Sequence, residues 1–135
     1  MASLPADKVI VNDDEVEELI LVRSSVVMIA GLWKLYKLRA WENRRLAAIF
    51  DCPSLETCVI ERAHRLLESP DSPKLKSLTL KSCWRLQRLG RMPLIERLVI
   101  HDCPLLVSLP DREEVPLLRE VMITGCGVSS DGILG

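Results

Sequence analysis

Residues 75–83 read LKSLTLKSC and residues 95–103 read IERLVIHDC, so the pattern apolar-x-x-Leu-x-apolar-x-x-Cys occurs twice, twenty residues apart. Self-similarity at a fixed period is typical of repeat proteins, in which each unit stacks on its neighbour. The same pattern extends along the chain in both directions. Its six copies begin at Val16, Leu35, Leu55, Leu75, Ile95 and Leu118.

The prolines give an independent marker of the same period. Because proline has a fixed φ and no N–H group, it suits a loop that leads into a strand better than the strand interior. Four prolines stand two residues before a repeat start, namely Pro53, Pro73, Pro93 and Pro116. Their common phase supports a true structural repeat.

The length of the unit predicts the fold. In each copy the segment x-apolar-x-apolar-x, written x-Leu-x-Leu-x in its simplest form, alternates inner and outer residues, as a short strand requires. Twenty residues accommodate one strand and a return loop, but hardly a full helix, and stacking would pair the strands in parallel about 4.8 Å apart. We therefore predict a solenoid of about six repeats over residues 16–135, with short parallel strands on a concave face and mostly loop and 3-10 turns on the convex side. Residues 1–15 form a separate N-terminal segment, in which residues 9–11 are expected to fold back as an antiparallel capping strand.

Composition limits the classes of partner and compartment. Lysine and arginine number 18 against 19 acidic residues, a net charge of −1, so no overall basic field favours nucleic acid. The longest apolar run has eight residues, whereas a membrane span needs roughly 20. The N-terminal sequence lacks the basic lead and apolar core of a secretory signal. With five cysteines expected to be reduced, we predict a cytoplasmic protein that binds neither nucleic acid nor membrane.

The ninth position of each repeat is predicted to hold a small group that packs inward. It is occupied by Ser24, Asn43, Ala63, Cys83, Cys103 and Cys126. Cysteines separated by the repeat period form a row, whereas a zinc site needs four ligands around one point, so we expect no metal. Cys58 replaces a core leucine, and Cys52, in a loop, is expected to be the most exposed thiol.

No cluster of residues predicts catalysis. His101, Asp102 and Cys103 are consecutive, but successive strand residues point to opposite faces and cannot converge on one substrate atom. His64 is expected to be a solvated loop residue, and Trp33 and Tyr36 are expected to pack near the strand starts. We predict no catalytic residue, no cofactor and no enzyme activity.

The segment IERLVIHDCPLLVSLP resembles the irregular leucine-rich repeats of plant intracellular immune receptors of the coiled-coil, nucleotide-binding type, and LKSLTLKSCWRLQRL and LREVMITGC are similar. The resemblance covers residues 55–126 closely and residues 16–54 loosely. It implies an α/β leucine-rich-repeat domain that binds a pathogen effector, a guarded host protein or the receptor's own nucleotide-binding domain. The Gly-x-x-x-x-Gly-Lys-[Ser/Thr] loop of that domain is absent from this sequence, so we expect a receptor fragment, a truncated relative or a stand-alone repeat protein.

The concave face is the predicted protein-binding site, because outward strand residues fall into three columns along the stack. Arginine and aromatic side chains dominate the hot spots of protein interfaces. The predicted binding residues are Lys37, Arg39, Trp41, Val59, Thr79, Lys81, Arg97, Val99, His101 and Met122. The alternative is that they are ordinary strand residues on a solvated surface.

The sequence leaves two alternatives to a receptor's recognition module open. The segment CGVSSDGIL, residues 126–134, partly resembles the end of a repeat in F-box ubiquitin-ligase adaptors, which implies a substrate-binding repeat domain. A non-functional receptor fragment is the other alternative. Ile133 and Leu134 are expected to form a thin cap over the last core layer.

Overall fold

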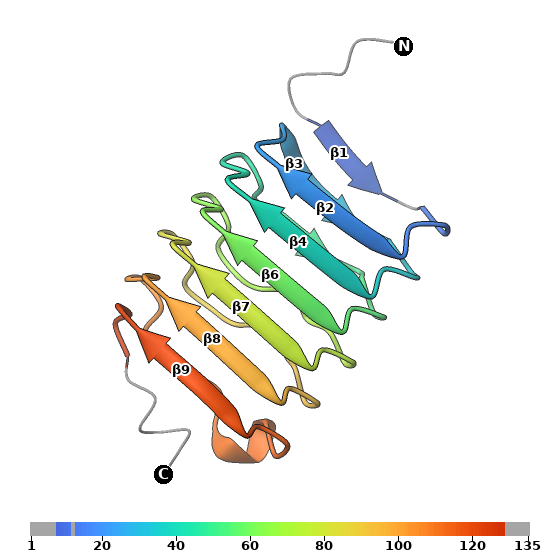
Figure 1. Cartoon of the computed structure of the whole chain (residues 1–135). Helices are drawn as coiled ribbons and strands as arrows, with labels where there is room; N and C mark the ends of the chain where they lie inside the picture. Colours follow the sequence, from blue (N-terminus) through green and yellow to red (C-terminus); the bar gives the residue numbers. More distant parts are fainter. Residues whose placement is uncertain (1–7, 12, 129–135) are drawn as a thin grey trace, which may run out of the picture.

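The computed structural model describes residues 8–11 and 13–128 of the chain, so the cap expected at Ile133 and Leu134 lies outside the described residues. Its main feature is a six-stranded parallel sheet in which the strands follow one another in chain order (Figure 1). Each strand begins two residues after a predicted repeat start, so the repeat and its parallel pairing are confirmed. The strands are β2 (Glu18–Val22), β4 (Lys37–Trp41), β6 (Thr57–Glu61), β7 (Ser77–Lys81), β8 (Arg97–His101) and β9 (Glu120–Thr124).

The register of this sheet is continuous from β2 to β9. Leu38 lies opposite Cys58, Cys58 opposite Leu78, and Leu78 opposite Leu98. Every residue therefore has its equivalent from the next repeat as its lateral neighbour. Equivalent residues form rows that cross the sheet from one end to the other.

The core lies between this sheet and the segments that return behind it. In β4, β6 and β7 half-buried residues alternate with buried ones, as expected for strands with one covered face. The return segments contribute a second line of apolar side chains with no exposed surface. These are Leu46, Leu66, Leu86 and Leu106.

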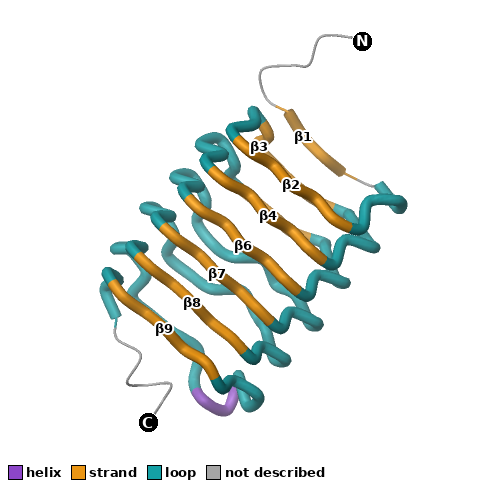
Figure 2. Tube along the Cα trace, in the orientation of Figure 1, coloured by secondary structure: helices purple, strands orange, loops and turns teal. Residues whose placement is uncertain are grey.

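A second, three-stranded parallel sheet lies behind the first repeats (Figure 2). Its strands are β1 (Lys8–Val11), β3 (Val26–Ala30) and β5 (Ala48–Phe50). The sequence of β3 is VVMIA, whose β-branched residues favour strands. The later return segments contain proline and glycine, and among the described residues they form an isolated bridge between Glu68 and Arg88 but no further strand. The 3-10 helix η1 (Arg112–Glu114) follows in the segment between β8 and β9. This second sheet was not predicted.

Two sequence-based expectations about the fold need correction. The described residues contain strands and one three-residue 3-10 helix but no α-helix, so the chain is a parallel-strand β-solenoid and the α/β class is not confirmed. β1 was expected to cap the first repeat in antiparallel orientation, but it pairs in parallel with β3. β1 takes the place of a return segment behind the main sheet. Because the return segments of successive turns all run in the same direction, β1 is parallel to β3.

The ninth position of the repeat is largely as predicted. Asn43 is fully buried: its Oδ1 accepts a hydrogen bond from the Ser24 backbone N–H at 2.9 Å, and its Nδ2 donates to the carbonyls of Leu21 and Trp41 at 2.9 and 3.1 Å. Ala63, Cys83 and Cys103 are also buried, while Ser24 and Cys126 are partly exposed. The row therefore fills the turn that follows each strand.

The expectation that Cys52 is the most exposed thiol is wrong. Only 1% of the residue is exposed, and its Sγ donates to the Phe50 carbonyl at 3.5 Å. The turn after β5 points this side chain into the core. Cys58 is buried as predicted, and burial raises the pKa of its thiol to about 12, which keeps it protonated at neutral pH.

Candidate functional site

The candidate site is the outward face of the six-stranded sheet, which we call the open face. All ten residues predicted to bind a partner have their positions on it, in three rows set by the strand register. They come from five strands: Lys37, Arg39 and Trp41 from β4, Val59 from β6, Thr79 and Lys81 from β7, Arg97, Val99 and His101 from β8, and Met122 from β9.

The middle row of the open face is mixed in polarity. It runs from Ile20 and Arg39 through Val59, Thr79 and Val99 to Met122. The two valines are half-buried because neighbouring strands flank them on both sides. Met122 is 61% exposed, since β9 has a partner strand on one side only within the described residues. The apolar surface is therefore more accessible at the ends of the row than at its centre.

Several charged side chains of the open face are already paired with one another. Lys81 Nζ lies 3.8 Å from Glu61 Oε1, and Arg97 Nε lies 3.1 Å from Glu120 Oε2. Exposed pairs of this kind contribute only about 0–1 kcal/mol, so a partner could replace them at little cost. Glu18 accepts a hydrogen bond from the Tyr36 hydroxyl at 2.9 Å, which raises the pKa of that tyrosine.

The N-terminal end of the open face has an apolar surface that the set of ten predicted residues omitted. Ile20 and Val22 in β2 are 61% and 53% exposed. A hollow of about 190 Å³ lies beside Ile20 and is bordered by Lys37 and Arg39. The alternation of residues in β2 puts both side chains on this face, so the sequence could have predicted their position. Their exposure follows from the place of β2 at the edge of the sheet.

The structure spreads the predicted residues over five of the six strands of the face. Trp41 and Met122 lie on strands four spacings apart, a distance of about 19 Å. The hollow in the face is smaller than the roughly 300–1,000 Å³ of a typical small-molecule pocket. The open face is therefore broad and shallow, as suits contact with a macromolecule.

The three consecutive residues His101, Asp102 and Cys103 face different surroundings. The His101 ring contacts the Thr124 hydroxyl, the Asp102 carboxylate accepts a hydrogen bond from Ser82 Oγ at 3.2 Å, and the Cys103 thiol is buried in the turn. A hydrogen bond with Cys83 and burial raise the pKa of Cys103. Within residues 8–11 and 13–128, no group of histidine, cysteine and acidic side chains is arranged to hold a metal ion.

Three aromatic residues differ from expectation. Trp33 and Tyr36 were expected to pack but are 46% and 39% exposed at the edge where the strands begin. His64 was expected to be solvated, but its ring stacks on Trp84 with the centroids 3.9 Å apart and the planes 4° apart. Positions 64 and 84 are equivalent in successive repeats, and this one-repeat offset was the signal that could have predicted their contact.

No protein-family model, curated protein sequence or solved structure was found to match the chain. Among the described residues, no helix has the length and apolar character needed to cross a membrane. The function of the open face must therefore be inferred from its geometry and chemistry.

Proposed function

We propose that this chain is a non-catalytic protein-recognition module that binds a protein ligand through the open face. The observation that carries this proposal is the exposure of Ile20, Val22 and Met122 on a face that also presents Arg39 and Arg97. Apolar and arginine side chains together are typical of binding surfaces, where the apolar groups contribute affinity and the charges contribute specificity.

The dimensions of the open face favour a folded partner. Six strands span about 24 Å and five residues along a strand span about 17 Å, so a small domain could rest on the whole surface. The face consists of regular strands whose backbones are held by their neighbours. A rigid surface loses little conformational entropy when it binds.

A finer assignment is part of the same proposal. The resemblance of residues 55–126 to the leucine-rich repeats of plant immune receptors supports a cytoplasmic role in defence. The ligand would then be a pathogen effector, a guarded host protein or the nucleotide-binding domain of a receptor. The solenoid of stacked repeats is compatible with such a recognition module.

Affinity capture from plant-cell extract, with the captured proteins identified by mass spectrometry, tests the proposal. The variant Arg39→Ala, Trp41→Ala, Arg97→Ala and His101→Ala removes four side chains of the open face. A matched control changes four exposed residues away from this face: Trp33→Ala, Lys34→Ala, Lys74→Ala and Arg91→Ala. We expect a partner that is retained by the wild type and the control but lost by the open-face variant. Equal capture by all three folded proteins would contradict the proposal.

A further inference from the structure

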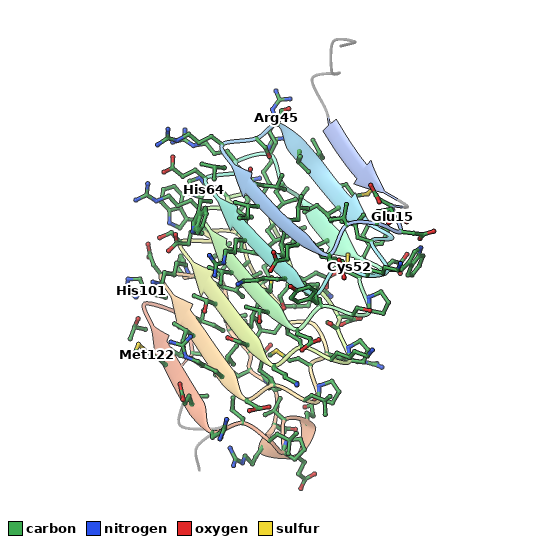
Figure 3. The ribbon with its side chains drawn as sticks, turned by 45° about the vertical axis from the view of Figure 1, so that its right-hand side comes forward. Glu15, Arg45, Cys52, His64, His101 and Met122 are labelled. Atoms are coloured by element: carbon green, nitrogen blue, oxygen red, sulfur yellow. The ribbon has the colours of Figure 1, made fainter. Side chains whose placement is uncertain are left out.

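Four short loops concentrate positive charge at one edge of the main sheet. Residues 23–25, 42–45, 62–65 and 82–85 contain six arginines and one acidic residue, although the whole chain has a net charge of −1. We call these loops the arginine edge. Figure 3 shows Arg45 and His64 on this side of the sheet and Glu15 on the opposite side. The arginines are Arg23, Arg44, Arg45, Arg62, Arg65 and Arg85.

The repeat itself directs these side chains outward. The tripeptides Arg-Arg-Leu, His-Arg-Leu and Trp-Arg-Leu end in the fully buried residues Leu46, Leu66 and Leu86. Because each leucine packs inward, the arginine before it lies at the surface, and residues 45, 65 and 85 are all exposed. Neighbouring turns of the solenoid are about 4.8 Å apart, so these arginines form a closely spaced row.

The single acid of the arginine edge is already engaged. Glu42 contacts Arg23 Nε at 3.2 Å and Arg62 Nη1 at 3.7 Å. Within the part of the chain that the structure describes, Arg44, Arg65 and Arg85 make no ion pair. Arg65 and Arg85 occupy equivalent positions in neighbouring turns, so their charges repel one another and a bound anion would gain favourable electrostatic energy there.

The arginine edge also has an aromatic component. Trp84 is 51% exposed, and its Nε1 donates to Asp102 Oδ2 at 3.4 Å. The His64 ring covers one face of the Trp84 ring. At the other end of the edge, Arg23 and Arg44, together with the acidic Glu42, border a hollow of about 510 Å³.

We propose that the arginine edge binds an extended acidic segment of a partner polypeptide. Four loops span about 14 Å, and side chains on one side of an extended peptide recur about every 7 Å, so two or three carboxylates can be contacted at once. The guanidinium fork binds a carboxylate through two hydrogen bonds. This surface adjoins the open face but contains none of its residues, so the inference does not depend on the proposed function.

A nucleic acid fits the arginine edge less well. An edge of about 14 Å contacts only a few phosphates, whereas strong binding of a phosphate backbone uses many. The remainder of the chain is acidic, which opposes a long polyanion.

Fluorescence polarisation with labelled probes of matched length tests this inference. The probes are a peptide of alternating glutamate and serine, the same peptide with glutamine in place of glutamate, and an oligouridylate. The wild type is compared with Arg44→Gln, Arg65→Gln, Arg85→Gln and with a control that removes the same charge elsewhere, Lys34→Gln, Lys74→Gln, Arg91→Gln. Far-UV circular dichroism establishes that both variants are folded, and the single arginine variants replace the triple variant if its spectrum changes.

We expect the acidic peptide to bind the wild type at least about tenfold more tightly than the glutamine peptide, with loss of binding at about 0.5 M salt. The arginine variant should weaken this binding about tenfold or more, and the control variant less than about twofold. Any single arginine variant should lose about two- to threefold. The inference is overturned if the wild type does not bind the acidic peptide, if both triple variants weaken binding equally, or if the oligouridylate binds more tightly than the peptide.

Discussion

At the scale of single residues, the turns after the strands use a backbone conformation that disfavours most side chains. Six equivalent positions have φ between 49° and 67°, and only the last is glycine. An L-residue in this region costs about 1–2 kcal/mol. The turn is fixed by ladder hydrogen bonds, such as the one that the Arg62 N–H donates to the Lys81 carbonyl at 2.8 Å. The positions are Arg23, Glu42, Arg62, Ser82, Asp102 and Gly125.

This conformation predicts an unusual order of stabilities at Arg62. We expect Arg62→Gly to be more stable than Arg62→Ala by about 1 kcal/mol, because only glycine adopts a positive φ without strain. Urea unfolding monitored by circular dichroism measures the difference. At Thr79, in the middle of β7, the order should be reversed, with the alanine variant the more stable. The same order at both positions would contradict this account of the turn.

His64 predicts a pH dependence of stability. Burial, together with the charges of Arg44 and Arg62, lowers the pKa of this histidine below its ordinary value of 6.5. The folded state then binds the proton less readily than the unfolded state, so stability is lost as the pH falls through about 6.5 towards the lowered pKa.

We therefore expect the unfolding free energy of the wild type to fall relative to that of His64→Gln between about pH 7.5 and about pH 5. Urea unfolding of both proteins across this range measures the difference. The buried Nε2 atom, which has no hydrogen-bond partner, gives a protonated ring no acceptor to stabilise it. Parallel pH profiles of the two proteins would rule out a titrating role for His64.

At the scale of the strand, the main sheet was predictable and the second sheet was not. Leu78 and Leu80 of β7 alternate with half-buried residues, and this alternation identifies a strand with one covered face. In β3 the burial pattern is irregular, so periodicity does not distinguish the strand from any other apolar segment. Periodicity does not predict the burial of Cys52 either, because that burial depends on where β5 places the turn that follows it.

The open face and the arginine edge were predictable from the sequence to different degrees. The outward positions of the open face follow from alternation alone, but the exposure of Ile20 and Met122 depends on which strands lie at the ends of the sheet. The arginine edge was missed because the net charge of −1 is a sum over the whole chain and conceals local clusters. The recurrence of arginine before Leu46, Leu66 and Leu86 was the readable signal.

The position of a strand in the sheet predicts how much its core residues stabilise the fold. Leu78 in β7 has no exposed surface, whereas Val121 in β9 is only partly buried. We expect Leu78→Ala to lower the unfolding free energy by about 2–5 kcal/mol and Val121→Ala to lower it by about 1 kcal/mol. Urea unfolding midpoints provide the comparison. A larger loss at Val121 would mean that β9 packs against more of the molecule than its burial indicates.

At the scale of the whole molecule, the extensive contacts between strands join only neighbours within a sheet. Stability in such a chain is close to a sum of local terms, so its ends open more readily than its centre. We expect amide hydrogen exchange to be slowest in β6 and β7 and fastest in β2 and β9. Mass-spectrometric exchange at peptide resolution checks this order. Uniform protection across all six strands would indicate a single cooperative unit instead.

The constant register has a consequence for how this architecture can vary. β7 and β8 start 20 residues apart and β8 and β9 start 23 apart, yet the rows remain aligned, because the extra residues lie in the segment between β8 and β9, which contains η1. A duplication of residues 75–94 would accordingly add one strand and leave the existing rows intact, while one residue inserted within a strand would reverse which side chains face the core. Changes in the number of repeats are thus the easiest route by which evolution could widen the face of such a protein without redesigning its interior.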